Sequence, residues 1–217
     1  AIEKIVQLLE NRKQITEARE FLASLRTKTP MLAPTAWSYE ARLLSDNNRS
    51  EEALEILSSA ILQFPQQHQL RMQRSFLADN LGRIDLAEHD LRYILDREPN
   101  NPNALNALGY ILADRTNRYT EARDLIEKAL ALMPESASII DSLGWVMYKQ
   151  GEIESAVQQL EKAFALMPDD EIAAHLVEIY WQNNQASAAH KIYKKLRKTT
   201  QQHPKLNATL KRFNISF

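Results

Sequence analysis

Apolar and small residues recur along this chain at intervals of 34 or 35 residues, most clearly between residues 102 and 168. Within each interval the apolar residues fall three or four apart, which is typical of two amphipathic helices joined by a turn. The paired positions are Leu108 and Leu143, Gly109 and Gly144, Ala122 and Ala156, Ile126 and Leu160, Ala129 and Ala163, and Pro134 and Pro168. One hairpin of this size cannot bury its apolar face alone, so the pattern predicts a solenoid whose neighbouring hairpins share a continuous core.

Two glycines, Gly109 and Gly144, fall inside predicted helices. Glycine in a helix interior costs roughly 1 kcal/mol relative to alanine, so a structural requirement must offset that cost. We expect a close approach of the second helix of each hairpin, where Ala122 and Ala156 are the matching small residues. Where other repeats carry Val6, Ser75 or Val177 in place of glycine, we expect looser crossings.

The same set of repeat positions, which we call the grid, extends over the whole chain. Its small position on the second helix is occupied by Ala18, Ala53, Ala87, Ala122, Ala156 and Ala189. Its closing positions are Pro30, Pro65, Pro99, Pro134 and Pro168, with Gln201 at the sixth. The predicted repeats are approximately 1–33, 34–67, 68–101, 102–136, 137–169 and 170–203. Leu206, Leu210 and Phe213 then have helical spacing, which indicates a capping helix within residues 204–217.

The Leu-Gly pair, the later Ala and the closing Pro resemble the pattern of the tetratricopeptide repeat (TPR) family. We therefore predict an all-α fold, an α-α superhelix (TPR solenoid) of about six helical hairpins plus the C-terminal capping helix. No linker or low-complexity segment interrupts the array, so residues 1–217 are expected to form a single domain. Residues 115–119 lengthen the turn of the fourth repeat by one residue relative to the fifth, either as a tolerated surface insertion or as a recognition loop.

The residue inventory argues against enzyme chemistry. The 217 residues include no cysteine, which excludes disulfides and thiolate chemistry, and only four glycines, too few for the glycine-rich loops that bind phosphate. Glu171 and His175 are four residues apart on one predicted helix, but two groups do not make a zinc site. We expect them to be a solvated carboxylate and imidazole. The prediction is a protein that is not an enzyme and has no cofactor and no bound metal.

In a TPR stack the first helix of each hairpin lines the concave side, and the resemblance therefore implies a binding groove for a protein or an extended peptide. The inward-facing candidates are Tyr39, Arg42, Gln73, Phe76, Asn103, Asn106, Tyr110, Asp141, Trp145, Tyr148, His175 and Trp181. Phe76, Tyr110 and Trp145 occupy one equivalent position in three successive repeats. These rings either form an aromatic stripe that contacts the partner or fill the space between neighbouring first helices. Arg42 and Lys149 lie about three repeats apart, so a carboxylate clamp of the chaperone-binding type is not expected.

Positive charge is concentrated at one end of the chain, although the net charge is −1. No Asp or Glu follows Glu178, and a basic end patch is formed by Lys191, Lys194, Lys195, Arg197 and Lys198. Such a patch is either a solvated helix face or a contact for an acidic partner or an anionic lipid surface. The acidic balance of the remaining residues argues against nucleic acid as the partner.

Residues 103–198 carry a closer resemblance. The segments LNALGYILADRTNRY, DSLGWVMYKQGEIESA and EIAAHLVEIYWQNNQ are similar to the C-terminal repeats of gammaproteobacterial outer-membrane TPR lipoproteins. That family implies an adaptor that binds a periplasmic carboxyl-terminal processing protease and helps it degrade substrates. It also implies a location on the periplasmic side of the outer membrane, through a lipid anchor absent from this chain.

Alternatives to this adaptor remain at the sequence level. The chain begins at Ala1 with helical apolar spacing already established, so we interpret it as a piece of a longer chain. It is either the adaptor fragment or a general TPR scaffold for envelope assembly or secretion, and a cytoplasmic location stays open. A further alternative is self-association through the terminal repeats, where Ile2, Ile5 and Leu9 would be available to a second copy.

Overall fold

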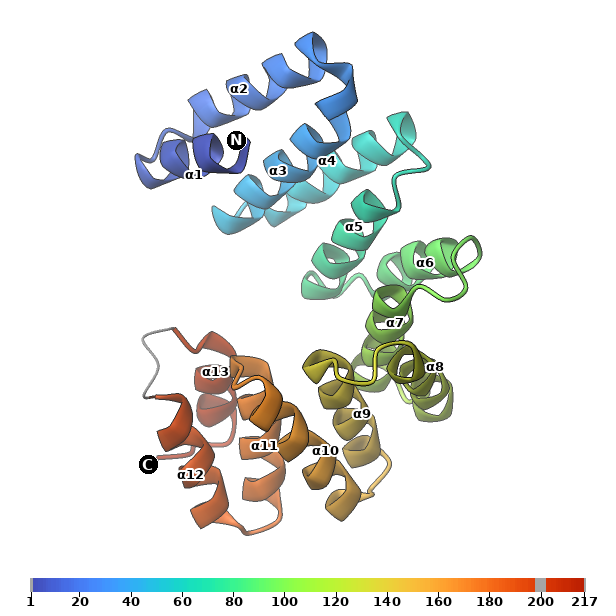
Figure 1. The fold of residues 1–217 in the computed structure, drawn as a ribbon. Coiled ribbons are helices and arrows are strands. Elements are labelled where there is room, and N and C mark those ends of the chain that lie inside the picture. The colour runs from blue at the N-terminus through green and yellow to red at the C-terminus, as the bar shows by residue number, and fades with distance from the viewer. Residues whose placement is uncertain (1, 198–201, 217) are drawn as a thin grey trace. The chain divides into compact units, whose positions relative to one another are not determined.

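The computed structural model describes residues 2–197 and 202–216, and within these ranges the chain is helical and has no strand. The helices are α1 (Ile2–Asn11), α2 (Ile15–Lys28), α3 (Ala33–Asp46), α4 (Ser50–Gln63), α5 (His68–Asn80), α6 (Ile84–Leu95), α7 (Pro102–Arg115), α8 (Tyr119–Leu132), α9 (Ala137–Lys149), α10 (Ile153–Leu166), α11 (Asp170–Gln182), α12 (Ala186–Leu196) and α13 (Pro204–Arg212), with a short 3-10 helix η1 (Pro30–Leu32) before α3. The pairs from α1–α2 to α11–α12 are the six predicted hairpins, and α13 is the predicted terminal helix (Figure 1). The all-α solenoid fold is therefore confirmed.

The chain divides into two compact units, unit 1 (Ala1–Pro99) and unit 2 (Asn100–Phe217). Unit 1 contains α1 to α6, and unit 2 contains α7 to α13. Within each unit the two helices of a hairpin pack on each other, and successive first helices also touch: α1, α3 and α5 in unit 1, and α7, α9 and α11 in unit 2. We call these surfaces the first-helix face of each unit. The single domain over residues 1–217 stays a prediction.

The predicted small residues lie where the two helices of each hairpin cross. All six alanines of the grid are fully buried, and a side chain added at either helical glycine would overlap the second helix. An ideal Cβ at Gly144 would lie 2.7 Å from Leu160 Cγ and 3.1 Å from the Ala156 carbonyl oxygen. At Gly109 the corresponding distances are 2.6 Å to Ile126 Cγ1 and 2.8 Å to the Ala122 carbonyl oxygen. The close crossing predicted from the sequence is confirmed.

Unit 1 also joins its helices through ion pairs whose carboxylates are buried. Glu40 of α3 is 2% exposed and lies between Arg19 and Arg26 of α2, with 2.9 Å between Arg19 Nε and its Oε1. Asp90 of α6 is fully buried and accepts hydrogen bonds from Arg71 and Arg74 of α5. A buried carboxylate with two guanidinium partners keeps its hydrogen bonds satisfied, which such a group requires in an apolar interior.

Most of the hairpin turns share one backbone conformation. A residue with positive φ stands at the same place in five hairpins: Lys13, Asn48, Gly82, Gly151 and Asn184. Its amide and the next amide bond back to carbonyls of the preceding helix, as in a Schellman helix end. The repeat detected in the side chains is therefore also present in the backbone.

The fourth hairpin differs, but not through a longer turn. Three residues separate α7 from α8, as in the other hairpins, and α7 is one residue longer than α9. Among the described residues this turn has none with positive φ; Thr116 is extended there, and its hydroxyl bonds the Leu112 carbonyl. The expected one-residue insertion into the turn is wrong, because the extra residue continues the helix.

The terminal helix α13 packs against α11, as expected for a cap. Leu206 is buried, while Leu210 and Phe213 are half-buried. Asp170 at the start of α11 accepts hydrogen bonds from the backbone amides of Lys205 and Leu206, at 2.8 and 3.0 Å. One carboxylate thus satisfies two amides of the first turn of α13, which otherwise have no partner within the helix.

Candidate protein-interaction face

The candidate groove residues all lie on first helices of the two units. Tyr39 and Arg42 are on α3, and Gln73 and Phe76 are on α5. The candidates in unit 2 are Asn103, Asn106 and Tyr110 on α7, Asp141, Trp145 and Tyr148 on α9, and His175 and Trp181 on α11. The predicted aromatic stripe runs from unit 1 into unit 2, so its continuity stays a prediction.

Unit 1 has a cavity of about 230 Å³ between α3 and α5. It is lined by Pro34, Thr35, Ser38, Tyr39, Arg42, Gln67, Gln69 and Leu70. Two of the predicted groove residues, Tyr39 and Arg42, are thus brought to one concave site. The sequence reasoning missed Thr35, Gln67 and Gln69, because only the packing of α3 against α5 places them together.

Two hydrogen bonds between α3 and α5 lie beside this cavity. The Ser38 hydroxyl donates to Gln73 Oε1 at 2.7 Å, and Gln73 Nε2 donates to the Ser38 carbonyl oxygen at 2.9 Å. Gln73 therefore holds the two helices together rather than presenting a free amide. Phe76, one turn further along α5, has 51% of its surface exposed and can offer apolar area to a partner.

Unit 2 contains a buried polar cluster around His175, which we call the His175 cluster. The imidazole is 7% exposed and its Nδ1 lies 2.9 Å from Asp141 Oδ1 of α9. Its ring stacks on the Trp145 indole with centroids 4.1 Å apart and an interplanar angle of 18°. The expected solvated imidazole is wrong: α9 packs against α11 and covers the ring.

Tyr110 of α7 connects the His175 cluster to a further carboxylate. The Tyr110 hydroxyl donates to Glu171 Oε1 at 3.1 Å, and the Tyr110 hydroxyl oxygen also lies 3.5 Å from His175 Nε2. Burial, together with Glu171, Asp114 and Asp141, raises the pKa of Tyr110 well above its usual value, so the phenol keeps the proton that it donates.

Both ring nitrogens of His175 therefore face acceptors. The Asp141 carboxylate oxygen can accept a hydrogen bond from Nδ1, and the Tyr110 hydroxyl directs its proton toward Glu171, which leaves its oxygen as an acceptor for Nε2. Burial alone would lower the pKa of His175, but the charges of Asp141, Glu171 and Asp114 outweigh it and raise that pKa above the usual value. A doubly protonated imidazolium fits this arrangement.

Trp145 fills space within unit 2. It is 3% exposed, and its Nε1 donates to Asp114 Oδ1 of α7 at 3.1 Å. The Tyr148 ring lies 5.3 Å from the indole, and Lys149 Nζ lies 4.9 Å from it. Of the two interpretations of the stripe, filling between first helices describes Trp145. Asp141 and His175, also buried, likewise hold first helices together, whereas Tyr110 and Tyr148 keep partly exposed surface.

The amides at the start of α7 differ from each other in exposure. Asn103 is exposed, and Asn106 is half-buried. The Asn106 Oδ1 atom is buried and has no hydrogen-bond partner among the described residues. On α11, Trp181 is half-buried and follows the buried part of that helix. Asn103 therefore offers an accessible amide on α7, and Trp181 offers a partly exposed indole on α11.

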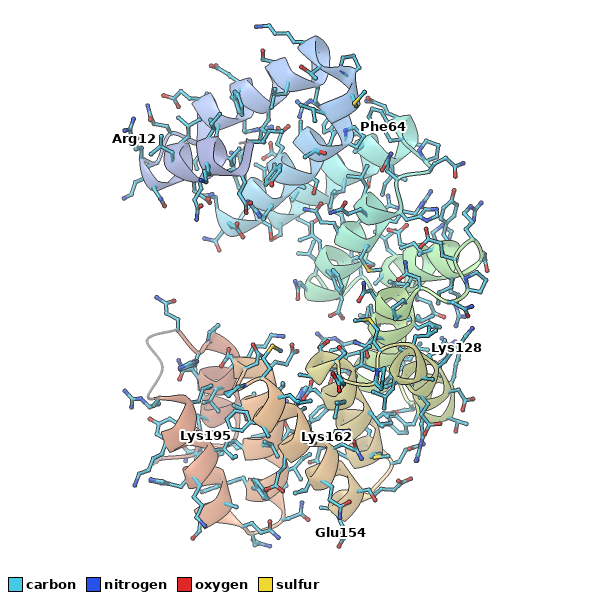
Figure 2. All side chains as sticks on the ribbon, in the orientation of Figure 1. Arg12, Phe64, Lys128, Glu154, Lys162 and Lys195 are labelled. Atoms are coloured by element: carbon cyan, nitrogen blue, oxygen red, sulfur yellow. The ribbon has the colours of Figure 1, made fainter. Side chains whose placement is uncertain are left out.

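The described residues of the basic end patch lie on α12 and at the residue that follows it. Lys191, Lys194, Lys195 and Arg197 are exposed there, and Lys198 lies outside the described residues. Lys195, labelled in Figure 2, has its Nζ 4.9 Å from the Phe164 ring centroid, and Arg197 donates to the Tyr193 hydroxyl. The patch is thus a surface of accessible cations on one helix.

The surface suggested for self-association differs from the expectation. Ile2 and Leu9 are half-buried and pack against the buried core around Val6, so only part of their apolar surface reaches solvent. Ile5 and Leu8 are the exposed apolar residues of α1, at 40% and 50%. The helical phase of α1, fixed by its packing on α2 and α3, decides which of its apolar side chains reach solvent.

The described part of the chain offers neither a metal-binding cluster nor a membrane-spanning helix. No group of three or more His, Cys, Asp or Glu side chains there could hold a metal ion. None of its helices is both long and apolar enough to cross a membrane.

Family models described as tetratricopeptide repeat match residues 77–137, 115–175 and 147–212. A TPR repeat-containing protein of Pseudomonas aeruginosa is 42% identical over 165 residues, which cover 76% of this chain and 28% of that protein. The human Cell division cycle protein 16 homolog is 31% identical over 97 residues, which cover 43% of this chain and 16% of that protein. The chain therefore spans less than a third of the length of these curated relatives.

Solved structures share the fold. A tetratricopeptide repeat protein from Parabacteroides merdae superposes with a TM-score of 0.76 at 16% identity, covering 98% of this chain and 84% of that one. A thermophilic TPR protein of Thermus thermophilus gives a TM-score of 0.73 at 19% identity, covering 84% of this chain and 100% of that one. At these identities the likeness establishes the helical-repeat architecture.

Proposed function

Because the chain belongs to the tetratricopeptide repeat family, we propose that it is a non-catalytic scaffold that binds an extended segment of a partner protein on its first-helix faces. The observation that carries this proposal is the cavity between α3 and α5, since its lining includes the predicted groove residues Tyr39 and Arg42. Concave sites with a few polar groups are where folded proteins usually hold ligands. The half-exposed Phe76 on α5 adds an aromatic contact of the kind that dominates many protein interfaces.

At a finer level, we propose that the partner is a periplasmic carboxyl-terminal processing protease or one of its substrates. The resemblance of residues 103–198 to the outer-membrane TPR lipoproteins motivates this step. In this proposal the chain is the C-terminal part of a lipid-anchored adaptor on the periplasmic side of the outer membrane.

The experiment is a crosslinking pull-down from envelope extract with this chain as bait. A Tyr39→Ala, Phe76→Ala double variant tests the first-helix face of unit 1. Leu62→Ala is the matched control, because Leu62 is 84% exposed on the second helix α4. Recovery of a processing protease by the parent and the control, but not by the double variant, supports both the adaptor and the face.

Other outcomes separate the two levels of the proposal. Equal recovery of the protease by all three baits would support the adaptor role but contradict binding on the first-helix face of unit 1. If a different partner is recovered, and its recovery depends on Tyr39 and Phe76, the scaffold function is supported and the proposed protease partner is contradicted. Loss of recovery by the Leu62→Ala bait as well would show that the effect is not specific to the face.

A second binding surface is supported by the four exposed cations of α12 and its end. If this patch is the contact, Lys194→Glu with Lys195→Glu will abolish recovery, and salt will weaken binding by the parent. Binding that is insensitive to both changes excludes the basic end.

A further inference from the structure

The cavity between α3 and α5 has an unbalanced charge. Among the described residues that line it, Arg42 carries the only formal charge, and none is a carboxylate. Thr35, Tyr39, Gln67 and Gln69 add hydroxyl and amide groups that can donate hydrogen bonds. A site that combines one guanidinium with several neutral donors favours an oxyanion over a neutral or cationic group.

The Arg42 guanidinium is available to such a ligand. Among the described residues it pairs with Glu3 of α1, at 3.4 Å between Nη1 and Oε1, and both side chains are about half exposed. Exposed pairs of this kind contribute little to stability, so a ligand carboxylate can replace Glu3 at low cost. The Tyr39 ring, 4.8 Å from Arg42 Cζ, keeps the guanidinium at the cavity by a cation–π contact.

The walls of the cavity are held in place before any ligand binds. The reciprocal hydrogen bonds between Ser38 and Gln73 fix the spacing of α3 and α5 next to it. Because these groups satisfy each other, they do not compete for a ligand. A preformed site loses less conformational entropy on binding than one that must assemble.

We propose that this cavity binds the side-chain carboxylate of an Asp or Glu within the extended partner segment, with Arg42 as its charge partner. This inference rests on the proposed scaffold function and specifies the chemistry of the segment that the scaffold recognises. A neutral segment would bury the Arg42 face without replacing its lost water, which is a cost that an acidic side chain avoids.

The test selects random peptides of about seven residues, which extend over roughly 23 Å, on the full chain and on two variants. Arg42→Gln removes the proposed charge partner. Arg49→Gln is the matched control, because Arg49 is 44% exposed in the α3–α4 turn and does not line the cavity. Both variants lose one positive charge, so a difference between them does not arise from net charge.

We expect the parent and Arg49→Gln to select peptides with Asp or Glu at one shared position, and Arg42→Gln to lose that preference. In the best peptide, replacing the acidic residue by its amide will weaken binding to the parent about tenfold and to Arg42→Gln much less. Thr35→Leu, which fills the cavity and leaves its charge unchanged, will also weaken binding of the acidic peptide.

Three results would overturn the inference. The first is selection of peptides without an acidic preference, or with a preference that persists in Arg42→Gln. The second is binding that is lost when the peptide C-terminus is amidated, which would assign the site to a chain-terminal carboxylate. The third is selection of no peptide at all. If the parent selects non-acidic peptides and Thr35→Leu does not bind them, the carboxylate inference fails but the proposed peptide-binding scaffold is supported. Failure of the inference is thus distinguishable from failure of the proposed function.

Discussion

The His175 imidazole of α11 lies nearly parallel to the Trp145 indole of α9, with 4.1 Å between the ring centroids. The two residues are 30 positions apart and come from successive repeats. Their contact brings an aromatic face, an imidazole whose pKa is raised and the Asp141 carboxylate into one buried cluster. An imidazolium above an indole gains cation–π attraction, which is stronger where water is excluded.

The stability of unit 2 is predicted to depend on the protonation of His175. The folded-state pKa of this histidine is raised by Asp141, Glu171 and Asp114 against the opposing effect of burial. Its contribution is therefore fully present below the unfolded-state pKa of about 6.5, and it is lost as the pH rises through the raised folded-state pKa. Urea unfolding should give a lower midpoint at about pH 9 than at about pH 6.

The same pH comparison on His175→Gln is the control. Burial also raises the pKa of Glu178, with Arg212 opposing it, so this group contributes with the same sign above its ordinary pKa. The variant retains Glu178 and loses both the titration of His175 and the His175 charge that lowers the pKa of Glu178. An equal pH dependence in parent and variant would contradict a role for His175, and NMR titration of its ring protons measures the pKa directly.

Gly144→Ala is predicted to destabilise the protein although alanine is the better helix former. The new Cβ would lie 2.7 Å from Leu160 Cγ and 3.1 Å from the Ala156 carbonyl oxygen, so Leu160 must shift or α9 and α10 must move apart. Overpacking of this kind costs about 1–3 kcal/mol, and Gly144→Leu should cost more. Thermal or urea unfolding checks both variants. A gain of about 1 kcal/mol for the alanine variant, as at an open helical site, would show that the crossing is not tight.

Trp145→Ala is predicted to lower the free energy of unfolding much more than Phe76→Ala, although the two aromatic positions are equivalent in the repeat. Trp145 is 3% exposed, so its removal should cost about 3–5 kcal/mol in the free energy of unfolding. Phe76 is 51% exposed, and its removal should cost less than about 1 kcal/mol. If Phe76→Ala weakens partner binding without loss of stability, the ring is a contact residue; similar unfolding curves for the two variants would contradict the burial difference.

Asp170→Ala is predicted to loosen α13 while leaving the rest of unit 2 folded. The carboxylate bonds the amides of Lys205 and Leu206, and loss of a helix cap typically costs about 1 kcal/mol. Hydrogen exchange of the α13 amides should accelerate, with little change in α9. Asp124→Ala is the control, because Asp124 is exposed on α8. Equal exchange of α13 in the two variants would argue against the cap.

The sequence predicted the repeat fold well because its signal is local. Each hairpin needs a small residue where its two helices cross, and the six alanines from Ala18 to Ala189 are all fully buried. Gly109 and Gly144 were correctly predicted at close crossings for the same reason. Because every repeat needs its own small residue at the helix crossing, the spacing of these residues alone reveals the number of hairpins.

The accessibility of the candidate site residues was decided only by tertiary structure. Phe76 and Trp145 hold equivalent repeat positions, yet α11 supplies His175 to cover the indole, while Phe76 stays half exposed. The cavity beside Arg42 likewise depends on how α5 packs against α3. Repeat periodicity specifies which face of a helix a residue occupies. What covers that face depends on side chains about 30 residues away, which differ from one repeat to the next.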